Sequence, residues 1–294
     1  MRTVYQATAR SSHPLSRVGT KDWAAVVHEV FPVDTQAIAN RTVWLPRLGI
    51  TFVPVQKAAS TKVKEFLLRW EVFAQTGTFV DFTRSQVHDP NERPTPLIRE
   101  RPEEFVQAVR SGTTTVVTMV RNPFARLASF YEWASERSDP ARARPETLDP
   151  RTFEGPTLKP HNLPNMLGFP VGSKPSMAEV VAAMLRMPPG KRNRHYDVQA
   201  AVNGYGATRI DTVLHVEAFA DGVRQLHARA QRNAGLALPA PDLERKNASG
   251  GGARAASYFA DDALRLQVVG FYDRDFTAFG YSRRLEDVGL PPKA

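Results

Sequence analysis

The sequence predicts an α/β protein of three layers, in which a central parallel sheet is flanked by helices. Two observations carry this prediction. Short apolar runs rich in β-branched residues are bounded by polar or proline-containing segments, as buried strands usually are. Each run is followed by a segment whose apolar residues recur at the spacing of one helix face. Strands that alternate with helices in this way form a parallel sheet covered by helices.

The first strand–helix unit begins at residue 49. Residues 49–55 (GITFVPV) form an apolar run, and Pro54 predicts that regular strand pairing ends near that position. Residues 63–70 then carry apolar side chains at i, i+3, i+4 and i+7, which is one face of a helix. Ser60 or Thr61 is the expected N-cap of this helix, because their side chains accept hydrogen bonds from the first turn.

Two further units follow the same order. Residues 114–120 (TTVVTMV) predict a strand, and Pro123 suits the first turn of the helix after it. Residues 212–216 (TVLHV) predict a third strand, and residues 218–231 predict its helix. No repeat with a fixed period is visible.

We expect one domain over residues 1–294, with a core over about 48–281. Residues 1–45 show no clean period and are expected to be irregular or weakly helical. Residues 138–165 are rich in Pro, Arg and Asp, which predicts a mobile insertion. The run 247–252 (NASGGG) is expected to be flexible by composition.

The composition restricts the chemistry. Basic residues number 39 and acidic residues 30, a net charge of +9, which favours an anionic partner such as a nucleotide or an acidic glycan. The sequence holds no cysteine, so disulfides, thiolate nucleophiles and cysteine-based zinc sites are excluded. The first residues lack a signal-peptide core, and no run of 18 apolar residues occurs, so we expect a cytoplasmic protein without an integral membrane segment.

The segment between the first strand and its helix has the properties of an anion site. It reads QKAAST and contains Lys57, Ala58, Ala59, Ser60 and Thr61. The N–H groups of a first helical turn lack partners within the helix, and the helix dipole favours negative charge there. The small alanines admit a phosphate, the two hydroxyls can donate, and the lysine adds a positive charge. The segment is P-loop-like, but neither GxxxxGK[ST] nor GxGxxG occurs in the chain. An ordinary capped connection is the alternative reading of this segment alone.

A second cation follows the second strand. Arg121 provides a fork of donors suited to a phosphate. Ser129 lies about two turns into the following helix, where its hydroxyl can turn toward the same anion. The alternative is an amphipathic helix with a surface arginine.

Together these segments resemble the sulfotransferases that use 3′-phosphoadenosine 5′-phosphosulfate (PAPS), in particular the branch of Golgi carbohydrate and heparan sulfate 2-O-sulfotransferases. That family binds the 5′-phosphosulfate with a Pro-Lys-x-x-(Ser/Cys)-Thr loop. Here the loop is Gln56–Thr61, with Gln56 in place of the proline. The family's second signature, Val-Arg-(Asp/Glu/Asn)-Pro-Phe-x-Arg-Leu-x-Ser-x-Tyr, binds the 3′-phosphate. It matches Val120–Tyr131 at nearly every position.

Weaker similarities extend the resemblance over most of residues 48–281. Arg194–Gln199 is similar to a His-Trp-x-x-Gln element of the carbohydrate branch, and Val216–Phe219 to a Tyr-Glu-x-(Leu/Phe) strand end. Tyr272–Tyr281 is similar to the closing Tyr-x-x-Asp-Phe-x-x-Phe-Gly-Tyr. Asn247 and Ser249 occupy the place of a family loop over the adenine and the 3′-phosphate.

The resemblance implies transfer of a sulfuryl group from PAPS to a hydroxyl, with release of 3′-phosphoadenosine 5′-phosphate (PAP) and without a metal. Lys57 is assigned to the bridging oxygen, the rest of its loop to the phosphate, and Arg121 with Ser129 to the 3′-phosphate. A histidine near neutral pH is the natural general base. His195 is the first candidate and His88 the second, and a Glu or Asp base stays open. The implied acceptor is a glycan or another hydroxylated small molecule.

Two other functions compete with this one. A P-loop-like nucleotide kinase would share the sheet and the anion loop, but it requires a Walker lysine and a magnesium-binding aspartate, which the sequence does not provide. A non-catalytic polyanion-binding protein would use the positive charge. The basic residues are dispersed and mixed with acidic ones rather than clustered with aromatics, so no nucleic-acid partner is expected.

Overall fold

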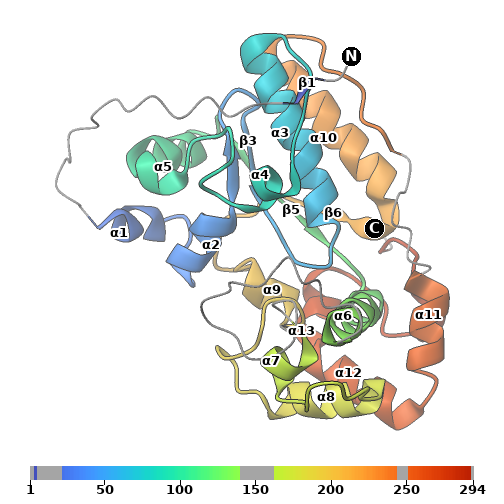
Figure 1. Cartoon of the computed structure of the whole chain (residues 1–294). Helices are drawn as coiled ribbons and strands as arrows, with labels where there is room; N and C mark the ends of the chain where they lie inside the picture. Colours follow the sequence, from blue (N-terminus) through green and yellow to red (C-terminus); the bar gives the residue numbers. More distant parts are fainter. Residues whose placement is uncertain (1–2, 5–21, 140–161, 244–250, 293–294) are drawn as a thin grey trace, which may run out of the picture. The chain divides into compact units, whose positions relative to one another are not determined.

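The computed structural model describes residues 3–4, 22–139, 162–243 and 251–292. The chain divides into two compact units (Figure 1). The first unit comprises residues 1–120 and 199–245, and the second comprises residues 121–198 and 246–294. Most of the expected insertion at 138–165 lies outside the described residues.

The first unit is built on a sheet of four strands in the order β2–β3–β5–β6. These strands are β2 (Val43–Leu45), β3 (Ile50–Val53), β5 (Thr115–Val120) and β6 (Thr212–His215). Strands β3, β5 and β6 are parallel, and β2 is antiparallel to β3. The predicted α/β class, with a mostly parallel sheet flanked by helices, is confirmed. The expectation of an irregular or weakly helical start was wrong for β2, which is too short to show an alternating pattern.

Helices cover both faces of this sheet. One face carries α3 (Ser60–Thr76) and α10 (Phe219–Ala234), and the other carries α1 (Trp23–His28), α2 (Thr35–Arg41) and α5 (Pro102–Arg110) (Figure 1). Successive strand residues point to opposite faces. Accordingly, Val117 packs with the core under α3 and α10, whereas Val116 packs with the core under α1 and α5. The two cores and the sheet between them make the three layers.

Short elements complete the first unit. They are β1 (Thr3–Val4), which pairs with β4 (Val80–Asp81), then α4 (Arg84–His88), η1 (Ile98–Glu100), α9 (Gln199–Val202) and η4 (Val216–Ala218). Across the part of the chain that the structure describes, no helix is both long enough and apolar enough to cross a membrane.

The second unit is helical. It contains α6 (Pro123–Ser138), α7 (Leu163–Leu167), α8 (Met177–Arg186), α11 (Gly251–Tyr258), α12 (Asp262–Phe271), α13 (Asp273–Ala278) and η5 (Leu285–Asp287). Phe124 of α6 packs against Phe259 and Phe276, with ring centroids 5.3 Å apart in both pairs. The expected flexibility of 247–252 was wrong for its last two glycines. They open α11, which packs on α6 and whose Ala255 is fully buried.

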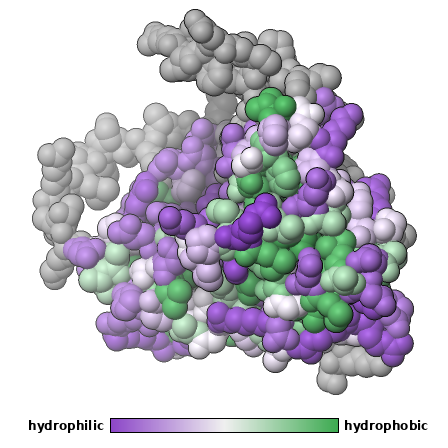
Figure 2. Space-filling model, turned by 90° about the horizontal axis from the view of Figure 1, so that it is seen from below, coloured by the Kyte–Doolittle hydropathy of each residue, from purple (hydrophilic) through white to green (hydrophobic). Residues whose placement is uncertain are grey.

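Helices α8 and α12 of the second unit carry exposed apolar side chains. Figure 2 shows apolar and polar side chains interspersed on the side of the molecule seen there. The exposed apolar side chains of these two helices include Leu185 and Leu266. Such scattered apolar residues are normal on a protein surface and require no special function.

Candidate functional site

The predicted donor loop joins β3 to α3, at the carboxyl end of a parallel strand, where α/β sheets place their ligands. Lys57 and Ala59 both adopt left-handed backbone conformations, with φ of 66° and 54°, while Ala58 between them does not. A left-handed non-glycine residue costs about 1–2 kcal/mol. Successive N–H groups in such alternating backbone form concave anion-binding nests. The strained backbone of this loop therefore favours an anion ligand.

The start of α3 differs from the sequence expectation. The helix begins at Ser60, and its N-cap is Ala59, which has no side-chain acceptor. The expectation of Ser60 or Thr61 as N-cap was wrong, because a left-handed alanine cannot be anticipated from propensity. Since Ser60 and Thr61 lie inside the helix, their hydroxyls are not used as caps. The first-turn N–H groups are thus left for another acceptor, as in helix-terminal phosphate sites.

The loop residues differ in exposure. Lys57, Ser60 and Thr61 are half-buried, whereas Ala58 is fully buried. The backbone N–H of Ala58 donates to the carbonyl oxygen of Val55 at 3.3 Å. Ala58 therefore anchors the turn to the core, and the lysine and the two hydroxyls form the accessible part of the loop.

His88, the second candidate base, lies against this loop. Its Nε2 is 3.3 Å from Thr61 Oγ1, and its Nδ1 is 3.4 Å from Lys64 Nζ. Lys64 is a member of this cluster that was not predicted from the sequence. The sequence could have indicated it, because Lys64 lies one turn after Thr61 on a helix face where the neighbouring residues are apolar.

The second signature opens the second unit. Arg121 directly follows β5, and Asn122 caps α6 by accepting a hydrogen bond from the backbone N–H of Phe124 at 3.0 Å. Pro123 occupies the first helical turn, as predicted. Arg121 and Ser129 are both half-buried.

The second arginine of this signature has a structural position. Arg126 is fully buried, and its guanidinium donates to the carbonyl oxygens of Asp197 at 2.7 Å and Arg194 at 3.0 Å. The hydroxyl of the fully buried Tyr272 donates to the carbonyl oxygen of Tyr196. Burial raises the pKa of Tyr272, which keeps its hydroxyl protonated as a donor. Both side chains therefore fix the segment that carries His195.

His195, the first candidate base, is half-buried in the second unit. Asn193 Oδ1 lies 2.7 Å from His195 Nδ1 and also accepts from the His195 backbone N–H at 3.0 Å. The imidazole stacks on Trp133, with centroids 4.6 Å apart and planes 21° apart. Because an amide oxygen only accepts, the neutral ring carries its proton on Nδ1. Nε2 is then the basic nitrogen, the form that a general base requires.

The other predicted elements have different outcomes. Asn247 and Ser249 lie outside the described residues. The closing Tyr272–Tyr281 motif belongs to the core of the second unit, since Asp275, Phe276 and Phe279 are buried. Glu217, expected at a strand end, lies in η4 just beyond β6.

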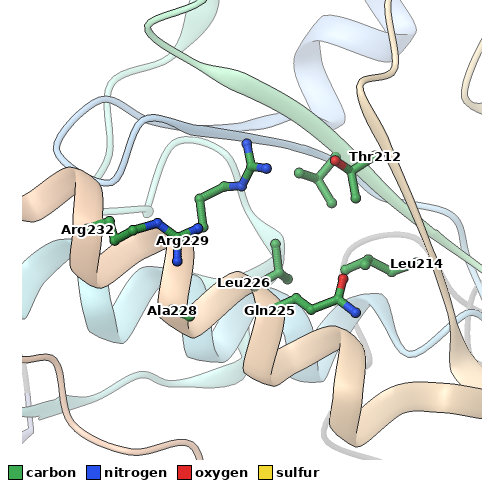
Figure 3. Close-up of a pocket in the computed structure, with 8 residues that line it drawn as sticks. Thr212, Leu214, Gln225, Leu226, Ala228, Arg229 and Arg232 are labelled. Atoms are coloured by element: carbon green, nitrogen blue, oxygen red, sulfur yellow. The ribbon is translucent and has the colours of Figure 1, made fainter.

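A pocket of about 270 Å³ lies elsewhere in the first unit, between β6 and α10 (Figure 3). Its walls include Thr212 and Leu214 of β6, and Figure 3 shows Arg229 and Arg232 extending from α10. Arg229 donates to Thr115, the first residue of β5. The pocket is therefore near the amino ends of the strands, opposite the end of β3 that carries the loop. Among the described residues, no group of three or more His, Asp or Glu side chains is arranged to hold a metal ion.

The fold is that of an α/β protein, and the loop after β3 lies at the carboxyl end of its sheet with a backbone suited to an anion ligand. The model of the Sulfotransferase family matches residues 40–282. The chain therefore belongs to the sulfotransferase family, whose members transfer sulfuryl groups. Searches of the curated proteins and of the solved structures found no match.

Proposed function

We propose that this protein transfers the sulfuryl group of PAPS to a hydroxyl of a glycan or another hydroxylated small molecule, as in the carbohydrate and heparan sulfate 2-O branch. The observation that carries the proposal is the loop after β3, where Lys57 and Ala59 adopt left-handed conformations before the uncapped start of α3. In a chain of the sulfotransferase family, this is the place for the 5′-phosphosulfate. The net charge of +9 suits an anionic donor and an acidic glycan acceptor.

In the proposed reaction, an acceptor oxygen attacks sulfur, and the bond between sulfur and the bridging oxygen breaks. Charge then develops on the 5′-phosphate of the leaving PAP. Lys57 stabilises the bridging oxygen, while the first-turn N–H groups and the hydroxyls of Ser60 and Thr61 hold the phosphate. The first-turn N–H groups are held by the helix before the reaction, so these donors need little reorganisation as charge develops.

The donor's 3′-phosphate is assigned to the second signature. Arg121 offers a planar fork of donors, and Ser129 adds a hydroxyl from the second turn of α6. These contacts would distinguish PAP from nucleotides that lack a 3′-phosphate. Asn247 and Ser249 are proposed to contact the same part of the donor.

His195 is proposed as the general base that takes the acceptor's proton. Its Nδ1–H is held by Asn193, its ring is held by Trp133, and its Nε2 carries the lone pair. His88 faces a different pair of groups, the Nζ of Lys64 and the hydroxyl of Thr61.

Thermal-shift measurements test the donor. PAP at 100 times its dissociation constant should stabilise the protein by about 2.7 kcal/mol. ATP with magnesium and duplex DNA, at matched salt, should have little effect. Stabilisation by ATP with magnesium but not by PAP would support the kinase and refute the proposal. Stabilisation by DNA alone would support a polyanion-binding protein.

A further inference from the structure

Lys64 is a buried cation beside the donor loop. It is only 5% exposed, and lysine is rarely buried without a partner. Its Nζ lies 3.4 Å from Nδ1 of His88, whose Nε2 lies 3.3 Å from Thr61 Oγ1. Thr61 and Lys64 are one turn apart on α3, so one imidazole reaches both.

The chemistry of these groups places the protons. An ammonium group can only donate, so Nδ1 of His88 is the acceptor for Lys64. The neutral imidazole then carries its proton on Nε2 and donates it to Thr61 Oγ1. Because that hydroxyl oxygen accepts from His88, its own proton is directed to another acceptor. This is the opposite tautomer to that of His195.

The backbone of His88 is held firmly. His88 is the last residue of α4, a helix that begins with a capping box between Thr83 and Gln86. Its carbonyl oxygen accepts from Arg93 at 3.3 Å. Arg93 is itself buried and also donates to the carbonyl oxygen of Thr42 at 3.4 Å. The backbone of His88 is therefore fixed beside α3, and its exposed imidazole contacts Thr61 from this position.

We propose that Lys64 and His88 are positioning residues that direct the Thr61 hydroxyl proton toward an oxygen of the donor's 5′-phosphate. The inference rests on the proposed function, since it requires a phosphate at the loop. Lys64 polarises the imidazole, His88 transmits this polarisation to Thr61, and Thr61 contacts the ligand. The two long contacts shorten when the phosphate binds, as hydrogen bonds in unliganded sites commonly do. His88 then supports the donor and takes no proton from the acceptor.

Calorimetric titration with PAP tests this role in six variants, one of which is Thr61→Val alone. His88→Ala and Lys64→Met should each weaken PAP binding about 10-fold, because an oriented hydrogen bond to a charged group is lost. His88→Gln should stay within about 3-fold of the unsubstituted protein, since its amide can accept from Lys64 and donate to Thr61. Lys62→Met is the matched control, because Lys62 lies on the same turn with its Nζ over the Phe66 ring, and its binding should be nearly unchanged.

The fifth variant, His88→Ala combined with Thr61→Val, shows whether His88 acts through Thr61. If it does, the double variant binds PAP as weakly as Thr61→Val alone. If the loss of PAP affinity in the double variant equals the product of the losses in His88→Ala and Thr61→Val, the inference is refuted.

Turnover of the glutamine variant separates positioning from base catalysis. Retained kcat in His88→Gln supports positioning, whereas a loss of about 100-fold with unchanged PAP affinity would identify a base and refute the inference. Unchanged PAP binding in His88→Ala would refute this inference alone. Absence of PAP binding by the unsubstituted protein would refute the proposed function as well.

Discussion

Replacing Arg126 tests how the second unit holds the segment of His195. Arg126→Met removes two hydrogen bonds from a buried guanidinium to the carbonyl oxygens of Asp197 and Arg194. Hydrogen bonds from charged donors contribute about 1.5–3 kcal/mol each, so the two contribute about 3–6 kcal/mol. The desolvation cost of the guanidinium disappears and offsets part of this loss. We expect a net decrease of about 3 kcal/mol in the free energy of unfolding.

Urea unfolding measures the total effect, and hydrogen exchange locates it. In Arg126→Met, the amides of Tyr196 and Asp197, which donate to the Asn193 carbonyl oxygen, should exchange faster. Turnover should also fall, because His195 lies in this segment. The matched control is Arg265→Met, which breaks a surface pair with Asp262 and should cost under about 1 kcal/mol.

Two results would refute the reasoning about Arg126. One is an Arg126→Met variant that unfolds within about 1 kcal/mol of the unsubstituted protein. The other is a stability loss without faster exchange in the segment, which would place the effect elsewhere in the unit.

Three other predictions concern the backbone at Gly49, the backbone at Ala59 and the titration of His215. Gly49→Ala should lower the free energy of unfolding by about 2–4 kcal/mol, because its Cβ would lie 2.7 Å from a backbone oxygen at a φ of 56°. The control Gly77→Ala, which has open space around it, should lose only about 1 kcal/mol. Equal losses in thermal unfolding of the two variants would contradict the predicted clash at Gly49. Ala59→Gly should gain about 0.5–1 kcal/mol by relieving the left-handed alanine, and a loss would show that no strain is stored there. Burial lowers the pKa of His215 in the folded protein below its usual 6.5. Between this lowered pKa and 6.5, the unfolded chain binds more protons than the folded protein does. The free energy of unfolding therefore falls as the pH drops below 6.5. His215→Gln should reduce the fall in melting temperature with falling pH, whereas the control His28→Gln, at an exposed position, should leave it unchanged. Equal pH dependence in the unsubstituted protein and both variants would exclude His215 as the cause.

The regular part of the fold was predictable because each strand–helix unit repeats the same strong periodicity. Residues 114–120 and 218–231 became β5 and α10 with small shifts at their ends. Strand β2 escaped prediction because three residues show no alternation, and its pairing with β3 depends on contacts that only the folded sheet makes.

The candidate site was predictable in its residue types and not in its contacts. The left-handed conformation of Ala59 is imposed by the turn around it and not by alanine itself. The contact between Lys64 and His88 joins residues separated by 24 positions and depends on how α4 packs near α3. Arg126 was visible as part of a signature, but its role required knowing which carbonyl oxygens face it.

Transfer of labelled sulfuryl from PAPS to a panel of glycans and hydroxylated small molecules tests the central claim most directly. The unsubstituted protein should form a labelled product and release PAP in equal amount. Lys57→Ala should abolish transfer with only a modest loss of PAP binding, because Lys57 acts on the oxygen where charge develops. Arg121→Ala should instead weaken PAP binding strongly. The reverse pattern would contradict the assigned roles, and transfer by Lys57→Ala at the unsubstituted rate would contradict the account as a whole.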